Sequence, residues 1–253
     1  MPVGRHGWPP QMALATASST RATNTPVTIK RRLFGFTALI LRGHYRGCMQ
    51  RLVVHAMSID DVRDIFRAPP PLAERLRAVA AERFATPHPS RRTWFAPLTR
   101  RDPATEVDAS RPLRTDVDAL LTGAYIAPER VPQSWTIFMA WLEELSVAHR
   151  EIPYDGAAFE RVEWDLARCG LNSDYALRSL AERQLGVPLR PMPHQVAGYA
   201  KRVHALEALE DFRRVLDNPE CAAESRAWLE PVVDVLESVA ATEGPDVVVV
   251  GAD

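Results

Sequence analysis

Apolar residues recur at helical spacing along most of the chain after residue 48. This spacing, with capping residues and prolines at the starts of segments and glycines at their ends, predicts about eight helices. The predicted ranges are 58–67, 71–85, 112–122, 128–149, 155–169, 173–185, 196–216 and 219–243. A single mostly α domain is the architecture that this pattern predicts.

Two short segments interrupt the helical pattern, at 51–56 and 246–250. Both are rich in β-branched residues, and the run from Val247 to Val250 is too short for a helix. Each segment is the only good strand partner of the other. We therefore expect a small two-stranded β element that brings the two ends of the domain together.

Charge divides the chain at residue 48. Residues 1–48 hold seven Arg or Lys and no Asp or Glu, whereas residues 49–253 hold 24 basic and 32 acidic residues. We therefore expect a basic, poorly ordered tail at 1–48 and a helical globular domain at 49–253.

The tail allows three interpretations. The bias toward Arg, Ala and Pro is typical of a high-GC genome, in which open reading frames often extend upstream of the true start, here Met49 or Met57. A targeting segment is the second interpretation, because basic residues precede the apolar stretch at 33–41. A basic arm for nucleic acid is the third.

Composition bears on the cellular compartment of the protein and on its association with membranes. The apolar stretch at 33–41 is far shorter than the roughly 20 residues that a membrane-spanning helix needs. Three cysteines in 253 residues argue against a disulfide scaffold. A cytoplasmic protein with no membrane association is the expectation.

Several short motifs appear in a definite order along the domain. They are a first strand and short helix, the segment Asp118 to Gly123, the segment Pro188 to Pro193 before Gly198 and Tyr199, and Trp228 and Leu229 before a final valine strand. In this order the chain resembles an uncharacterised, mostly helical actinobacterial family of unknown function, over roughly 49–253. The resemblance implies a fold and no activity.

No catalytic, cofactor or metal motif is present in the sequence. His149 is expected at the C-terminal end of a helix, where it would interact with the helix dipole, and His204 on a solvated, salt-bridged face. Cys169 and Cys221 are expected in helices, in packing roles. The prediction is therefore no catalytic residues, no metal and no cofactor.

One loop cluster is a candidate binding surface, because guanidinium groups and an exposed Trp suit a phosphate or carboxylate partner. Its residues are Arg91, Arg92, Trp94, Arg100 and Arg101. The alternative is that Trp94 and Phe95 only anchor the loop on the core.

The preferred functional interpretation is a non-catalytic module that binds an unidentified protein partner, as a regulator or an immunity-type binder. The acidic domain argues against nucleic acid as the main partner. The alternative is an enzyme whose site residues lie scattered in the sequence, and its candidates are His149, His194, His204, Asp155 and Cys169. Convergence of these side chains in one pocket would distinguish the two.

Overall fold

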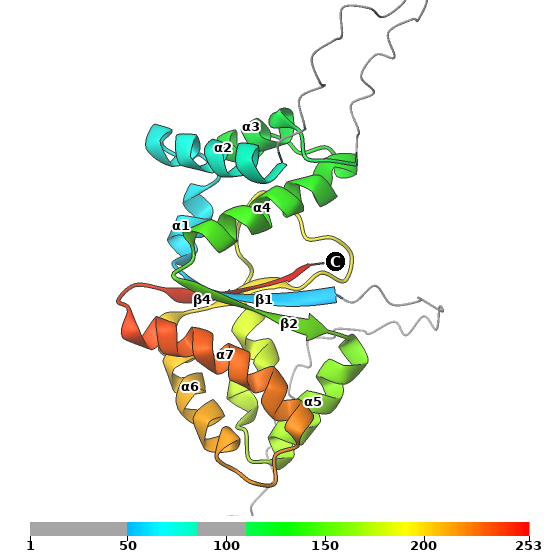
Figure 1. The fold of residues 1–253 in the computed structure, drawn as a ribbon, viewed down its shortest axis with the longest axis vertical. Coiled ribbons are helices and arrows are strands. Elements are labelled where there is room, and N and C mark those ends of the chain that lie inside the picture. The colour runs from blue at the N-terminus through cyan, green and yellow to red at the C-terminus, as the bar shows by residue number, and fades with distance from the viewer. Residues whose placement is uncertain (1–49, 85–109, 253) are drawn as a thin grey trace, which may run out of the picture. The chain divides into compact units, whose positions relative to one another are not determined.

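The computed structural model describes residues 50–84 and 110–252, which belong to one compact unit. Seven α-helices and a four-stranded sheet make up this part of the chain (Figure 1). The elements are β1 (Gln50–Met57), α1 (Ile59–Asp64), α2 (Pro70–Phe84), α3 (Arg114–Thr122), η1 (Pro128–Arg130), α4 (Val131–Leu145), β2 (Ala148–Tyr154), α5 (Gly156–Arg168), η2 (Ser173–Tyr175), η3 (Leu177–Ala181), β3 (Ala197–Ala200), α6 (Arg202–Leu216), α7 (Ala223–Ala241) and β4 (Asp246–Ala252).

The sheet is antiparallel throughout, with the order β2-β1-β4-β3. The predicted pairing of the first and last strands is confirmed, since Val53 lies opposite Val250 and Val54 opposite Val249. The prediction of only two strands is wrong. β2 pairs with the free side of β1, and β3 pairs with the free side of β4, so the predicted pair forms the centre of a larger sheet.

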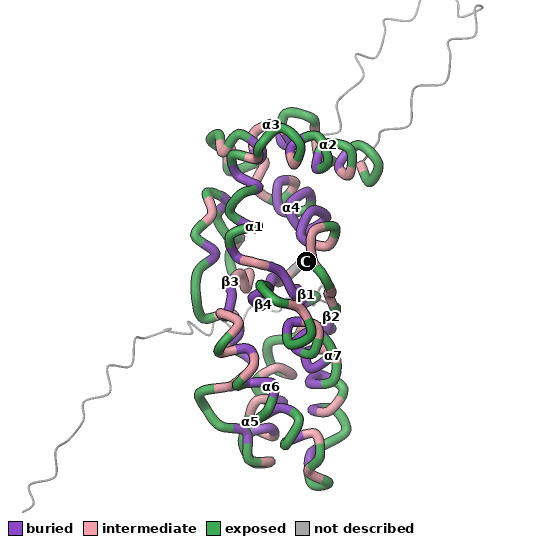
Figure 2. Tube along the Cα trace, turned by 90° about the vertical axis from the view of Figure 1, so that its left-hand side faces the viewer, coloured by how far each residue is buried: buried purple, intermediate pink, exposed green. Residues whose placement is uncertain are grey.

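Helices cover both faces of the sheet, which makes three layers (Figure 1). Side chains alternate along β1, so Leu52, Val54 and Ala56 join a core with α5, α6 and α7, whereas Val53 and Met57 join a core with α1 to α4. Figure 2 shows buried residues along the strands and along the inner sides of the helices. The central strands β1 and β4 are therefore buried on both faces, which explains why β4 contains four consecutive valines.

Three predicted helices differ from the structure. The segment from 173 to 185 forms the short 3-10 turns η2 and η3, not a helix. The helix expected at 196–216 begins only at Arg202, because residues 197–200 form β3. The helix expected from 128 to 149 ends at Leu145, and His149 lies in β2, where it cannot cap a helix.

Capping residues set the starts of two helices as the sequence predicts. The Ser58 hydroxyl accepts a hydrogen bond from the Asp60 amide at 3.2 Å at the start of α1. The Asp155 carboxylate accepts from the amides of Ala157 and Ala158, both at 3.3 Å, at the start of α5. Each side chain satisfies amides that have no partner within the helix.

Gly123 ends α3 in the left-handed conformation, with φ of 65°. A Cβ at this position would have its nearest neighbours 3.8 Å away, so any penalty comes from the backbone and not from a clash. We expect Gly123→Ala to lower the free energy of unfolding by about 1 kcal/mol, because L-residues with a Cβ avoid this region. Gly123→Asn should cost less, since asparagine tolerates it better. Urea denaturation of the three proteins checks this, and equal losses in both variants would contradict it.

No helix among the described residues is long and apolar enough to span a bilayer.

Candidate functional site

The predicted loop cluster cannot be placed. Arg91, Arg92, Trp94, Arg100 and Arg101 lie in 85–109, outside the residues that the structure describes, as does the predicted tail at 1–48. Both predictions therefore stay predictions.

The candidate residues of the enzyme alternative take separate places in the fold. Asp155 caps α5, and Cys169 follows the last residue of the same helix. His149 lies in β2 opposite His55, with the two ring centroids 5.8 Å apart. His194 lies in the connection before β3, with a positive φ of 67°.

His204 in α6 is engaged in local contacts. Its Nε2 lies 3.1 Å from the Ser179 hydroxyl, and its ring lies 5.3 Å from the ring of Tyr175. The Tyr175 hydroxyl in turn donates to Glu207 at 3.2 Å. None of the five residues His149, His194, His204, Asp155 and Cys169 lines the hollow on α5 or the small apolar pocket beside Leu52 and Trp228.

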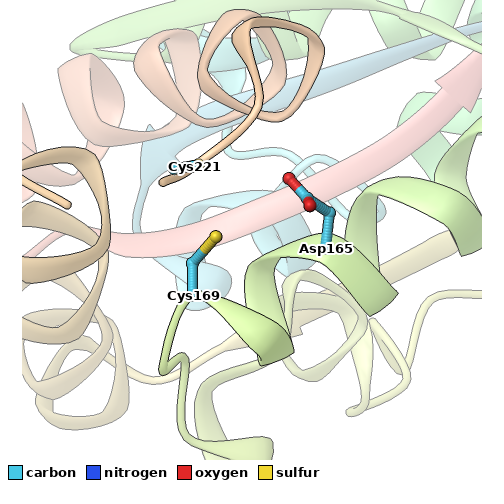
Figure 3. Close-up of side chains that lie close together, drawn as sticks. All are labelled: Asp165, Cys169 and Cys221. Atoms are coloured by element: carbon cyan, nitrogen blue, oxygen red, sulfur yellow. The ribbon is translucent and has the colours of Figure 1, made fainter. Parts of the chain in front are cut away.

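A different cluster forms where the end of α5 meets the turn before α7. Asp165, Cys169 and Cys221 each place one potential ligand atom so that all three atoms lie within 4.8 Å of one another. In Figure 3 the carboxylate of Asp165 and the sulfur of Cys169 both point from α5 toward the segment that carries Cys221. Both thiols are free. The prediction that the two cysteines lie within helices is wrong, because one follows α5 and the other precedes α7.

The carboxylate of Asp165 is held firmly. One oxygen accepts hydrogen bonds from the Ser225 hydroxyl at 2.7 Å and from the Ala222 amide at 3.1 Å, and the other accepts from Arg168 at 2.7 Å. The hydrogen bond from Ser225, followed by that from Arg168, lowers the pKa of Asp165 below its ordinary value. Asp165 is therefore ionised at neutral pH, and it caps the start of α7 from a neighbouring helix.

Cys221 is only 5% exposed, and Cys169 is half-buried. Burial, followed by the proximity of Cys169, raises the pKa of Cys221 to about 11. The Cys221 thiol is therefore protonated at neutral pH and is a poor nucleophile. The cluster therefore offers two sulfur atoms and one carboxylate oxygen as potential ligand atoms.

The outer side of α5 carries the second feature of this region. Trp164 is 75% exposed, and it lies in a shallow hollow on the helix surface. The lining residues of the hollow are Ala157, Glu160, Arg161, Trp164, Asp165 and Arg168. Arg161 forms an exposed ion pair with Glu224 at 3.5 Å, and Arg168 pairs with Asp165. An exposed tryptophan between two arginines is a composition typical of protein-binding surfaces.

Sequence reasoning missed this surface although a signal was present. Phe159, Val162 and Leu166 mark the buried side of α5, and Trp164 falls between the last two, on the opposite side of the helix. No sequence pattern indicated the cluster of Asp165, Cys169 and Cys221. Cys169 and Cys221 are 52 positions apart, a separation that matches no metal-binding spacing.

No protein-family model, curated protein or solved structure matches this chain.

Proposed function

We propose that this chain is a non-catalytic protein-interaction module that binds through the outer face of α5. The main support is the exposure of Trp164. This large aromatic side chain is 75% exposed, in a hollow flanked by Arg161 and Arg168. Tryptophan and arginine dominate the residues that contribute most to binding energy at protein interfaces. Burying the Trp164 ring against a partner removes its apolar surface from water.

The partner that this face fits is a second copy of the chain. Glu160 lies four residues before Trp164 and Arg168 four residues after it, so each is one helical turn from the tryptophan. If two copies of α5 cross antiparallel about a two-fold axis at Trp164, Glu160 of each copy meets Arg168 of the other. The two tryptophans stack at the axis, and the charges on either side are complementary.

The small residues on the same face support close approach of the helices. Ala157 and Ala167 are both exposed on α5, and Ala167 would face Arg161 of the second copy in this arrangement. One helix of 13 residues covers less than a standard interface, which buries about 1,600 Å² in total. We therefore expect a weak dimer, with dissociation in the micromolar range.

Trp164→Ala is expected to weaken this dimer at least tenfold, because it removes the central aromatic contact. Analytical ultracentrifugation of the full chain, from low micromolar to millimolar concentration, measures the change. Tyr125→Ala is the matched control, because Tyr125 is 83% exposed and lies outside α5. Thermal melting shows whether both variants remain folded.

A charge exchange tests the geometry independently of the tryptophan. Glu160→Arg places like charges opposite one another and should weaken the dimer about tenfold, whereas adding Arg168→Glu should restore it. Arg168→Glu also removes the ion pair with Asp165, so the melting curve of each variant is compared with that of the wild type. A wild-type chain that stays monomeric over the whole range overturns the proposal. A dimer that neither Trp164→Ala nor the charge exchange alters also overturns it, because the interface would then lie elsewhere.

A further inference from the structure

We propose that Asp165, Cys169 and Cys221 form a binding site for one thiophilic divalent cation of the Zn²⁺ class. This inference does not rest on the proposed dimer, although Asp165 also lines the hollow on α5 and pairs with Arg168. It also departs from the sequence-based expectation of no metal. The three ligand atoms come from two parts of the fold, the last turns of α5 and the segment before α7.

The spacing of the ligand atoms suits a tetrahedral ion. Zinc binds thiolate sulfur at about 2.3 Å, so two sulfurs on a tetrahedral ion lie about 3.8 Å apart. The three ligand atoms lie within 4.8 Å of one another without an ion, so shifts below about 1 Å bring them to that spacing. Two sulfurs and one carboxylate oxygen form a donor set that zinc prefers over calcium or magnesium.

Neighbouring groups orient the three ligands. Ser225, the Ala222 amide and Arg168 use three of the about four acceptor sites of the Asp165 carboxylate, so it keeps capacity for an ion. The Asn218 side-chain amide donates to the Cys169 carbonyl at 3.1 Å. Hydrogen bonds of this kind position metal ligands in known sites.

Arg226 fixes the segment that carries the third ligand. Its guanidinium donates to the Cys221 carbonyl at 3.1 Å, and also to the carbonyls of Leu216 and Asn218. The end of α6 and the turn before α7 are thereby held together. Cys221 consequently faces α5 on a backbone that is fixed before any ion arrives.

The charges of the deprotonated ligands favour a bound cation over an empty site. With both thiols deprotonated, the cluster would carry three negative charges in a partly buried place, which an ion of charge two largely neutralises. Thiolate and not thiol is the metal ligand, so the ion must displace the thiol protons. Binding therefore releases protons, and the affinity rises with pH.

Three protein ligands leave one coordination position of a tetrahedral ion unfilled. Cys169 and Asp165 are both partly exposed, so this position faces solvent. Water or an external ligand would occupy it.

Titration of the reduced, untagged full chain with Co²⁺ tests the proposal. Cobalt bound to thiolates gives a charge-transfer band in the near ultraviolet, and a tetrahedral ion gives strong bands in the visible. We expect saturation at one equivalent, displacement of cobalt by Zn²⁺, and an increase in melting temperature with Zn²⁺. Cys169→Ser and Cys221→Ser should each abolish the charge-transfer band of the wild type or reduce it by half, with affinity lower at least tenfold.

Cys48→Ser is the matched control, because Cys48 is the third cysteine of the chain and is not one of the three proposed ligands. It should bind cobalt like the wild type. Asp165→Asn should lower the affinity at least tenfold while it keeps the sulfur band, and Cys221→Ala shows by its melting curve whether loss of the thiol alone unfolds the protein. The proposal is overturned if the reduced wild type gives no band. It is also overturned if Cys48→Ser removes the band while Cys221→Ser retains it.

Discussion

Replacing Gly198 with alanine is expected to lower the free energy of unfolding by about 3 kcal/mol, the upper range for an overpacked site. A Cβ on Gly198 would lie 2.1 Å from the Ala181 carbonyl oxygen and 2.8 Å from the Arg183 carbonyl oxygen. Both are backbone atoms, so no side-chain rotation relieves the contact. The segment from η3 to Arg183 would have to move away from β3, which breaks the pairing of Arg183 with Tyr199.

Gly156→Ala is the matched control for this substitution. A Cβ on Gly156, the first residue of α5, meets no atom within 4 Å, and alanine favours the helix. We expect this variant to be unchanged or more stable by about 0.5 kcal/mol. Guanidinium denaturation of both variants beside the wild type gives the two differences. A Gly198→Ala loss no larger than about 1 kcal/mol would show that the η3 segment yields easily.

The stability of the wild type is expected to fall by about 2 kcal/mol between pH 7 and pH 5 because of His55 alone. His55 is completely buried, and neither of its ring nitrogens has a hydrogen-bond partner. Burial, and then repulsion from His149 on the adjacent strand, lowers the pKa of His55 from 6.5 to about 3. The folded state therefore holds the ring neutral, whereas the unfolded chain protonates it below about pH 6.5. Stability that is present above pH 6.5 is lost as the pH falls toward 3.

His55→Leu isolates this effect, because leucine has a similar volume and no titratable group. We expect the variant to be at least as stable as the wild type at pH 7, since it removes two unsatisfied polar atoms from the core. At pH 5 it should exceed the wild type by about 2 kcal/mol more than at pH 7. Urea denaturation at several pH values measures the difference. Parallel pH profiles for the two proteins would mean that His55 does not titrate on unfolding.

The central pair of strands was predictable, whereas the edge strands were not. The valines of β4 are buried on both faces, so their run is a direct consequence of its central place. β2 has one fully buried side chain, Ile152, among polar and charged residues, and it contains Pro153. β3 has four residues, of which three are Ala or Gly. Tyr199 in β3 also lies at helical spacing from Val196 and Val203, which makes the strand look like part of α6.

The sequence could predict the exposed tryptophan of the candidate site but not the cluster of cysteines beside it. Trp164 lies off the buried stripe of α5, and a helical projection of 155–169 predicts its exposure. The proximity of Asp165 and Cys169 to Cys221 depends on how α5 packs on α7 and on the turn that Arg226 holds. Neither the packing nor the turn leaves a spacing pattern in the sequence.

The position of β4 determines when this domain can complete its folding during synthesis. Asp246 at the start of β4 accepts a hydrogen bond from the Ile59 amide, a contact between residues 187 positions apart, and the Arg202 amide and Lys201 join it. Both cores include valines of β4, so neither can close before the last strand has left the ribosome. Contacts between residues so far apart in the sequence slow folding. Until they form, apolar side chains and unpaired strand edges stay exposed. Until β4 emerges, the nascent chain would present β1 with one open edge, in the form that a chaperone binds.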